Sequence, residues 1–389
     1  MSTRTFDVIV IGSGSVGMPT ALFLSQAGLR TAVFEGYPSP GQGANKAAIG
    51  GVRATHSDAA KIILGSESLH FFRTWQETYG TSLGWKKGGY LFPVYREEDE
   101  KTLRDLLPFQ RSYNLDIRWI EPKGVADLVP GIREEGLLGG TWSPDDGQVS
   151  PLLANDAMFR TAEKAGCSFF FNEAVREIIS RNGKVEGVQS KSGRTIAGAV
   201  IVAAGAKARQ VLSPLALEVP VFPEIHEAGI TSPMADFLSP LVVDMRPGRD
   251  GKTANFYFGQ NAEGAVLFCY TPRHPHQGLT REGTSEFLPI FARRLLDLLP
   301  RMKNALVRRT WAGHYPMTPD GLPVLGRAPG FSGLFLAVGM CGQGFMLGPG
   351  VGKTLLHLVT ERITPEDEKV LRALNPSRRF SKEHAEVLA

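Results

Sequence analysis

The first forty residues hold the feature that most constrains the fold, a glycine pattern between two apolar runs. Residues 8–11 read Val-Ile-Val-Ile, which is typical of a buried parallel strand. The run ends at 12–17, Gly-Ser-Gly-Ser-Val-Gly, and a helix is predicted from about residue 15 to residue 27. In this setting Gly12 permits a tight turn, Gly14 lets the backbone approach a pyrophosphate, and Gly17 lets the helix pack close to the strand. The pattern predicts a dinucleotide site at the helix N-terminus.

An acidic residue at the expected distance supports this prediction. A second strand is predicted over residues 31–34, and Glu35 follows it, 18 residues after Gly17 and close to the expected spacing of roughly 20. A carboxylate at this place hydrogen-bonds a ribose hydroxyl and disfavours a 2′-phosphate. The dinucleotide is therefore FAD or NAD rather than NADP.

The composition narrows the class of protein. The chain has 389 residues, of which 42% are hydrophobic and 21% charged, and its net charge is only +4. These values are ordinary for a globular protein and give no case for a nucleic-acid partner. No apolar run reaches the roughly 18 residues that a membrane span needs, and the early first strand predicts that there is no signal peptide. Three distant cysteines indicate a reducing compartment, without a disulfide framework or a metal site. We expect a cytoplasmic protein.

The rest of the chain predicts segments of two kinds. Outside a loop of small residues at 37–56, helices are predicted at 58–79, 97–113, 152–165 and 285–299. Strands are predicted at 88–95, 169–172, 174–181, 184–190, 195–197, 200–205, 241–244, 255–258 and 265–270. We expect an α/β fold in which a Rossmann-like dinucleotide-binding domain with a central parallel sheet is interleaved with an α+β domain built on an antiparallel sheet. The first domain is placed at 1–84, 144–215 and 316–389, including a C-terminal tail, and the second at 85–143 and 216–315.

A third glycine cluster lies near the C-terminus. A strand at 333–339, a glycine-rich turn at 340–350 and a helix at 351–361 repeat the pattern of the N-terminus, so a second helix N-terminus is expected to face the same cofactor. Residues 348–354 approximate a phosphate-binding loop, but the position five before Gly352 is Leu347 instead of glycine. We therefore predict no nucleoside-triphosphate site. The charged tail from Glu366 is predicted to dock or to fray.

Taken in order, these motifs resemble the glycine oxidase / D-amino acid oxidase family of FAD enzymes, and most of all the β subunits of sarcosine oxidase and dye-linked proline dehydrogenase. The matching segments are GSGSVG at 12–17 with Glu35, GGVRATH at 50–56, GYLF at 89–92, DDGQVSP at 145–151, VAAGA at 202–206, TPDGLPVLG at 318–326 and GMCGQGFMLGP at 339–349. The resemblance covers essentially the whole chain and implies that FAD stretches across the first domain.

The resemblance also assigns residues to the parts of FAD. The first turn and Glu35 would hold the pyrophosphate and the adenosine ribose, the loop at 42–53 would pass along the isoalloxazine, and Val175 would contact the adenine. The turn at 342–346 would lie at flavin N1, where backbone N–H groups stabilise the charge of the reduced flavin by up to roughly 2 kcal/mol, on the order of 40 mV. The predicted cofactor-binding residues are Gly12, Gly14, Ser15, Val16, Gly17, Glu35, Gly43, Ala44, Asn45, Lys46, Gly50, Gly51, Val175, Ala204, Gly205, Gly342, Gln343, Gly344, Phe345 and Met346.

Three departures from the family pattern change what the resemblance implies. The stretch at 310–316 has no cysteine, so FAD should be bound non-covalently. His56 and Met346 replace an arginine and a lysine that hold the substrate carboxylate in monomeric sarcosine oxidases, which moves this role to Arg53, His56 or Arg273. No lysine lies within 264–270, where one helps oxygen to react in those enzymes. This favours a dehydrogenase with electron-acceptor subunits, and hence a hetero-oligomer, over an oxidase.

The chemistry implied is the oxidation of the carbon–nitrogen bond of a small secondary or primary amino acid, such as sarcosine, proline or glycine. Hydride passes to flavin N5, and the imine then hydrolyses in water. The candidate catalytic residues are His314, Arg53, His56 and Tyr257, because histidine and tyrosine can take a proton or a hydrogen bond and arginine can hold a carboxylate. Each of them also suits a structural role.

Two other functions fit the same sequence. An FAD-dependent 2-hydroxy acid dehydrogenase would need a stronger base beside the reacting carbon. A non-catalytic FAD subunit of an electron-transfer complex would need no substrate site at all.

Overall fold

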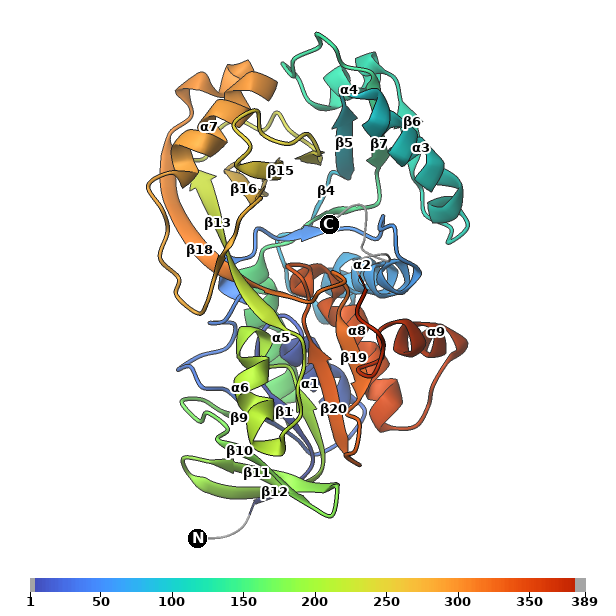
Figure 1. Cartoon of the computed structure of the whole chain (residues 1–389), viewed down its shortest axis with the longest axis vertical. Helices are drawn as coiled ribbons and strands as arrows, with labels where there is room; N and C mark the ends of the chain where they lie inside the picture. Colours follow the sequence, from blue (N-terminus) through green and yellow to red (C-terminus); the bar gives the residue numbers. More distant parts are fainter. Residues whose placement is uncertain (1–3, 382–389) are drawn as a thin grey trace.

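The computed structural model describes residues 4–381, which form two lobes, each built around one sheet (Figure 1). The sheet of the lower lobe has eight strands, β1 (Arg4–Ile11), β2 (Thr31–Phe34), β9 (Ser168–Phe170), β10 (Glu177–Arg181), β11 (Lys184–Ser190), β12 (Gly193–Val202), β19 (Val324–Arg327) and β20 (Leu334–Val338). Its order is β10-β11-β12-β1-β2-β9, with β20 also paired to β12 and β19 to β20. The central pairs, β20-β12-β1-β2-β9, are all parallel.

Both faces of this sheet are covered. Val8 and Val10 of β1 join the core formed with α1 (Gly17–Gln26), α2 (Ala59–Tyr79), α5 (Pro151–Lys164) and α8 (Gly344–Val359). Ile9 and Ile11 join the opposite core, which includes α6 (Ala208–Leu212) and the β10–β11 hairpin. Successive side chains of a strand point to opposite faces, so a strand buried on both sides needs a continuous apolar run.

The sheet of the upper lobe has nine strands. They are β5 (Tyr90–Val94), β6 (Arg118–Ile120), β7 (Gly139–Ser143), β13 (Phe222–Thr231), β14 (Leu241–Asp244), β15 (Thr253–Gln260), β16 (Val266–Pro272), β17 (His276–Gln277) and β18 (Val307–Met317). All pairs are antiparallel except β5–β14. On one face Phe256 and Phe268 pack against Phe291 of α7 (Phe287–Leu298). The predicted fold class, a parallel sheet interleaved with an antiparallel one, is confirmed.

Smaller elements complete the chain. The helices α3 (Glu97–Arg111) and α4 (Pro122–Leu128) flank the upper sheet (Figure 1), and the short strands β3 (Gly51–Val52), β4 (Lys86–Lys87) and β8 (Gly147–Gln148) form a third sheet between the lobes. The predicted charged tail forms α9 (Pro365–Ala373), which begins with a capping box between Thr364 and Asp367. Its last residues, 382–389, lie outside the described range.

Several predicted elements need correction. The predicted strands at 195–197 and 200–205 are one strand, β12, which pairs with β1 along its length. The longest pair of the upper sheet, β13 with β18, was not predicted, because prolines, glycines and charges interrupt the alternation in both segments. Helix α8 begins at Gly344 rather than at Val351, so much of the predicted glycine-rich turn is helical.

The glycines of α8 serve helix packing. A Cβ atom added at Gly348 would lie 2.0 Å from the Ser15 carbonyl oxygen, and one at Gly350 would lie 2.2 Å from the Leu64 carbonyl oxygen. The helix therefore approaches the turn before α1 and the backbone of α2 more closely than any side chain would allow. Lys353, the lysine of the apparent phosphate-binding loop, instead pairs with Glu67 at 2.6 Å.

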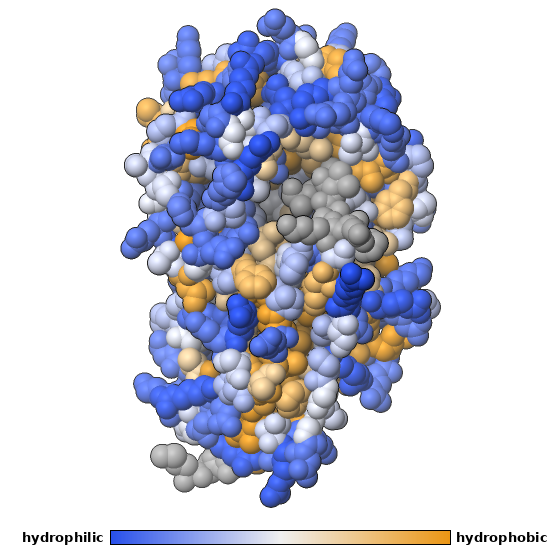
Figure 2. Space-filling model, viewed as in Figure 1, coloured by the Kyte–Doolittle hydropathy of each residue, from blue (hydrophilic) through white to orange (hydrophobic). Residues whose placement is uncertain are grey.

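The surface is mainly polar on the face shown in Figure 2, and the helices in the described part of the chain are not of the membrane-spanning kind. Hydrophilic residues cover most of the face seen in Figure 2, and hydrophobic residues gather in smaller groups between them. Among residues 4–381, no helix combines the length and the apolar composition that crossing a membrane requires.

The packing of α8 predicts the effect of one methyl group. We expect Gly350→Ala to lower the free energy of unfolding by about 1–3 kcal/mol, because the new Cβ overlaps the α2 backbone. Gly198→Ala is the matched control, since a Cβ at that exposed strand position meets no atom within 4 Å. Urea unfolding of both variants measures the difference, and equal stabilities would contradict the packing role.

Candidate active site

A cavity of about 480 Å³ lies between the two lobes. Its walls come from the glycine turn after β1, the loop at 43–53, the N-terminus of α8, and the face of the upper sheet opposite α7. The cavity is therefore assembled from segments that lie far apart in the sequence.

Two helix N-termini open on this cavity. The N-cap residues of α1 and α8 are Val16 and Gln343, and neither side chain caps its helix. Backbone N–H groups at such ends, together with the helix dipole, favour an anionic ligand. A Cβ added at Gly14 would meet nothing within 4 Å, whereas one at Gly17 would lie 1.9 Å from the Gly12 carbonyl oxygen. Gly14 thus leaves space for a ligand, and Gly17 allows the helix to pack.

Glu35, directly after β2, lines the part of the cavity formed by the lower lobe. Its Oε2 accepts hydrogen bonds from the Ser13 backbone N–H at 3.0 Å and the Ser13 hydroxyl at 2.7 Å, and its Oε1 accepts one from the Tyr37 N–H at 3.0 Å. A carboxylate oxygen can accept two bonds, so Oε1 retains capacity for a ribose hydroxyl. Glu35 therefore both fixes the glycine turn and lines the cavity.

The loop at 43–53 is held against both lobes. Trp311 of β18 donates its indole N–H to the Ala47 carbonyl oxygen at 2.9 Å, and a Cβ added at Gly313 would lie 2.5 Å from the Ala47 Cβ. Within the loop, Asn45 accepts a bond from the Ser15 hydroxyl at 3.0 Å and donates to the Pro151 carbonyl at 3.1 Å. These bonds fix the small residues of the loop, which line one wall of the cavity.

The upper sheet supplies a row of polar side chains. Tyr257 of β15 and Tyr315 of β18 place their hydroxyl oxygens 2.6 Å apart, and the His226 ring stacks on Tyr315 with centroids 3.8 Å apart. Burial raises the pKa of both tyrosines and lowers the pKa of His226. At neutral pH the tyrosines are therefore protonated and the histidine is uncharged.

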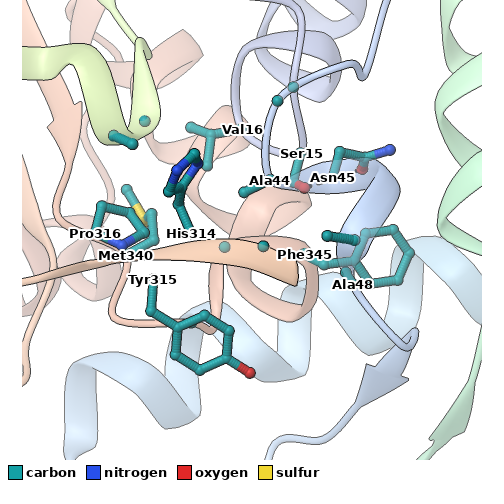
Figure 3. A pocket seen from close by; sticks show the side chains of 18 of the residues that line it. Ser15, Val16, Ala44, Asn45, Ala48, His314, Tyr315, Pro316, Met340 and Phe345 are labelled. Carbon is teal, nitrogen blue, oxygen red and sulfur yellow. Dashed lines mark hydrogen bonds between the residues drawn. The ribbon is translucent and has the colours of Figure 1, made fainter. Parts of the chain in front are cut away.

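His314 lies on the other side of the same strand. Figure 3 shows the His314 and Tyr315 side chains pointing to opposite sides of β18. The His314 Nε2 lies 3.0 Å from the Thr280 carbonyl oxygen, to which it donates, and burial followed by the charge of Arg281 lowers its pKa. The structure thus separates His314 from Tyr257, although both line the cavity.

Arg53 lines the cavity beside Tyr90 and Phe92 and is 5% exposed. Its Nη1 donates to the Thr55 carbonyl oxygen at 2.5 Å. Asp146 fixes the same segment, because its carboxylate accepts bonds from the Ala54 N–H at 3.0 Å and the Thr55 hydroxyl at 2.9 Å. Burial raises the pKa of Asp146 to about 6.

Most of the predicted site residues border the cavity. Those that line it are Gly12, Gly14, Ser15, Val16, Glu35, Gly43, Ala44, Asn45, Gly50, Gly51, Arg53, Val175, Ala204, Gly205, Tyr257, His314, Gly342, Gln343, Gly344, Phe345 and Met346. Gly17 stands behind the wall, where it packs α1 against the turn.

Lys46 and His56 do not line the cavity. The Lys46 side chain points to solvent, where its ammonium group donates to Gln42 at 3.0 Å. His56 is fully buried, and its carbonyl accepts a bond from Gln110 of α3. Arg273 is exposed and outside the cavity lining.

The sequence did not point to several lining residues, among them Tyr90, His226, Cys269 and Arg281. Tyr90 and Cys269 lie on strands that were predicted. The alternation of side chains between the two faces of each strand was the signal that could have placed them toward the cavity. His226 lies on β13, which was not predicted as a strand. Arg281 lies in a connection without regular structure, so no pattern identifies it.

Comparison with known proteins decides the family. A family model described as FAD dependent oxidoreductase (DAO) matches residues 7–358. The chain belongs to this family. Glycine oxidase of Geobacillus kaustophilus is 26% identical over 374 residues, which cover 94% of this chain and 96% of that one. D-amino acid dehydrogenase of Neisseria gonorrhoeae is 26% identical over 313 residues, 78% of this chain and 71% of that one.

Solved structures agree. The crystal structure of L-proline dehydrogenase from P. horikoshii matches with a TM-score of 0.90 and 27% identity, covering 97% of this chain and 98% of that one. The predicted cofactor, FAD, is confirmed by the family. The residues fit it, because uncapped helix ends, open glycines and one acid occur in the order that its phosphates and ribose require.

The bonds of Glu35 predict a specific loss of cofactor affinity. We expect Glu35→Gln to weaken FAD binding about tenfold, because one acceptor oxygen is replaced by an NH2 group, which cannot accept a hydrogen bond from the N–H of Ser13 or from that of Tyr37, whichever it faces. Flavin fluorescence titration of the apoprotein measures this. The exposed Glu218→Gln is the control, and an unchanged affinity in Glu35→Gln would contradict the role.

Proposed function

We propose that this protein uses FAD to oxidise the carbon–nitrogen bond of a small amino acid. The named relatives, glycine oxidase, D-amino acid dehydrogenase and L-proline dehydrogenase, support this activity. The chain spans 96% of the first and 98% of the last of these relatives.

The charge distribution of the cavity carries the proposal. Among the lining residues in the described part of the chain, Glu35 is the only carboxylate, and it lies at the adenosine end. Arg53 is the cation beside the upper sheet, where it can hold a substrate carboxylate by charge-assisted hydrogen bonds. Asp146, which lies outside the cavity lining, is an acid whose charge interacts with Arg53. Among the described residues that line this end, no acid is present to pair with a cationic amine. The site therefore suits an amino acid whose carboxylate is held and whose amine becomes uncharged.

The polar groups around the substrate end favour an amine over a hydroxy acid. Tyr257, Tyr315 and Cys269 all have raised pKa values because they are buried, and that of Cys269 reaches about 12. None of them is a base at neutral pH. His314 donates its Nε2 proton to a backbone carbonyl, and the His226 ring, which also lines the cavity, stacks on Tyr315. Burial lowers the pKa of both histidines, so each is a weaker base than a free imidazole. Removing a hydroxyl proton would need a stronger base, whereas an amine reacts once it is neutral.

The chain's own residues then bind and orient the substrate. FAD supplies the two-electron acceptor. Arg53 fixes the carboxylate, and the Tyr257–Tyr315 pair presents a hydroxyl to the nitrogen, to which it can donate or from which it can accept a hydrogen bond. Phe92, Leu241 and Val243 line the same end and exclude water from the reacting carbon. The oxidised substrate is an imine, which hydrolyses in water.

Finer features belong to the same proposal. The thiols of Cys269 and Cys341 line the cavity but are buried with raised pKa values, and protonated thiols are weak nucleophiles, which supports non-covalent FAD. The absence of a lysine at 264–270 supports a dehydrogenase that passes electrons to partner subunits. We place the enzyme in the cytoplasm, and sarcosine, proline and glycine are the substrates to test first.

The proposal predicts that amino acids reduce the flavin. In the absence of oxygen, sarcosine, L-proline or glycine should bleach the visible flavin absorbance. Arg53→Met should raise the concentration needed for half-maximal bleaching by one to two orders of magnitude, roughly the value of a charged hydrogen bond. Arg309→Met, at an exposed position of β18, is the control. Bleaching by 2-hydroxy acids alone, or by no small molecule, would refute the proposal.

The ionisation of the site predicts the pH dependence. The pKa values of Tyr257 and Tyr315 are raised above 10 and those of His226 and His314 lie below 6.5, so these groups keep their charge between about pH 7 and pH 9. The second-order rate constant of flavin reduction should therefore rise with the fraction of neutral amine. Two substrates with different amine pKa values should give profiles displaced by that difference. A common profile for both would instead reveal a base on the enzyme.

A further inference from the structure

A segment of the upper lobe, residues 278–284, crosses to the lower lobe at the edge of the cavity. It connects β17 to α7, and Leu279 and Arg281 within it line the cavity. Both ends are fixed to β13. The Gly278 N–H donates to the Pro223 carbonyl oxygen at 3.0 Å, and the Thr284 N–H and hydroxyl each donate to the Glu227 carboxylate at 2.7 Å.

The middle of the segment reaches the lower lobe through Arg281. Its Nη1 donates to the Gln42 carbonyl oxygen at 2.8 Å, and its Nη2 donates to the Tyr37 hydroxyl at 3.2 Å. The guanidinium also lies 5.4 Å from the Tyr37 ring centroid. Tyr37 in turn donates its backbone N–H to Glu35, so Arg281 closes over the part of the cavity where the adenosine ribose is expected.

Apart from Arg281, few contacts hold the middle of the segment in place. Thr280 accepts the hydrogen bond from His314, which ties the segment to β18. Leu279, Thr280 and the residues at 282–284 are all exposed. A segment with few buried apolar contacts opens locally at low cost. The contacts of Arg281 with Gln42 and Tyr37 are thus the main bonds across the lobes that opening must break.

We propose that residues 278–284 are a strap that closes the cofactor channel, with Arg281 as its latch, and that the strap must swing away from Gln42 and Tyr37 for FAD to enter or leave. The proposal assigns a function to Arg281 that the oxidation reaction does not require. It also gives His314 a structural role, as a tether of the strap.

A latch has a kinetic signature that a direct ligand contact lacks. Each bond of the latch joins two protein groups, so the latch can form with or without FAD. Weakening it should raise the rates of FAD uptake and FAD release together, and the dissociation constant should change much less than either rate. A residue that only contacts FAD would change the release rate and leave the uptake rate in place.

The test measures both rates in the full-length protein. Uptake is followed in a stopped-flow instrument as the quenching of flavin fluorescence when FAD is mixed with the apoprotein. Release is followed from the holoenzyme in the presence of an excess of an unrelated apoflavoprotein that traps free FAD. In Arg281→Ala we expect both rates to rise about tenfold.

Milder variants keep the test decisive if Arg281→Ala folds poorly. Tyr37→Phe removes only the hydroxyl that accepts from Arg281, and should raise both rates by a smaller factor. The double variant should be no faster than Arg281→Ala alone, because both changes break the same contact. Arg249→Ala, at an exposed arginine of the same lobe outside the cavity lining, should leave both rates unchanged.

Three results would overturn the strap: a faster release with unchanged uptake in Arg281→Ala, no change in either rate, or strictly additive effects of Arg281→Ala and Tyr37→Phe. The first would make Arg281 a direct contact of FAD. No substrate is needed, so the outcome is independent of whether the enzyme oxidises amino acids.

Discussion

The contact between α1 and α8 is the constraint on which the site depends. A Cβ added at Gly352 would lie 2.8 Å from the backbone nitrogen of Thr20 in α1, and one at Gly348 would lie 2.0 Å from the carbonyl oxygen of Ser15, just before α1. Because the helices meet near their starts, both N-termini open on one cavity. The partial positive charges of both helix N-termini therefore act on the same cavity, where they favour an anionic ligand. A larger residue at Gly348 would push the helices apart, and their two N-termini would no longer act on the same part of the cavity.

The upper sheet contributes by having two unlike faces. One face carries phenylalanines that pack against α7, and the other carries the tyrosine pair and Arg53's neighbours. The pairing of β13 with β18 extends this sheet down to the cofactor loop, where Trp311 fixes Ala47. The part of the cavity lined by the upper sheet is therefore held in place relative to the loop at 43–53, although the two belong to different lobes. Positive charge is also divided between the two parts of the cavity. Arg53 lies near the upper sheet, whereas Arg281 and Lys207 lie beside the Tyr37 ring.

The sequence predicted the parts of the structure that rest on local rules. The strand, glycine turn and helix at the N-terminus follow from an apolar run and from glycines whose backbone is crowded, and Glu35 follows from the spacing of the motif. The prediction failed where pairing is long-range. The alternation of β13 and β18 is broken by Pro223, Gly229 and Pro316, and only their mutual pairing and the pairing of β13 with β16 hold them as strands. The early start of α8 was also missed, because its glycines weaken helix propensity while serving packing.

Within the site the division is similar. The sequence alone determined that the chain has a Rossmann-like domain and that Glu35 follows the glycine turn at the spacing of a dinucleotide site, since these features need only backbone geometry and spacing. That the dinucleotide is FAD followed from the resemblance to the family and from the family match. Tertiary structure decided which side chains meet. His314 and Tyr315 are neighbours in sequence but point to opposite sides of β18, whereas Tyr257 and Tyr315, far apart in sequence, share a hydrogen bond. It also buried His56 away from the cavity and brought Arg281 to Tyr37. Such contacts depend on the register and twist of a sheet assembled from distant segments, which no local pattern encodes.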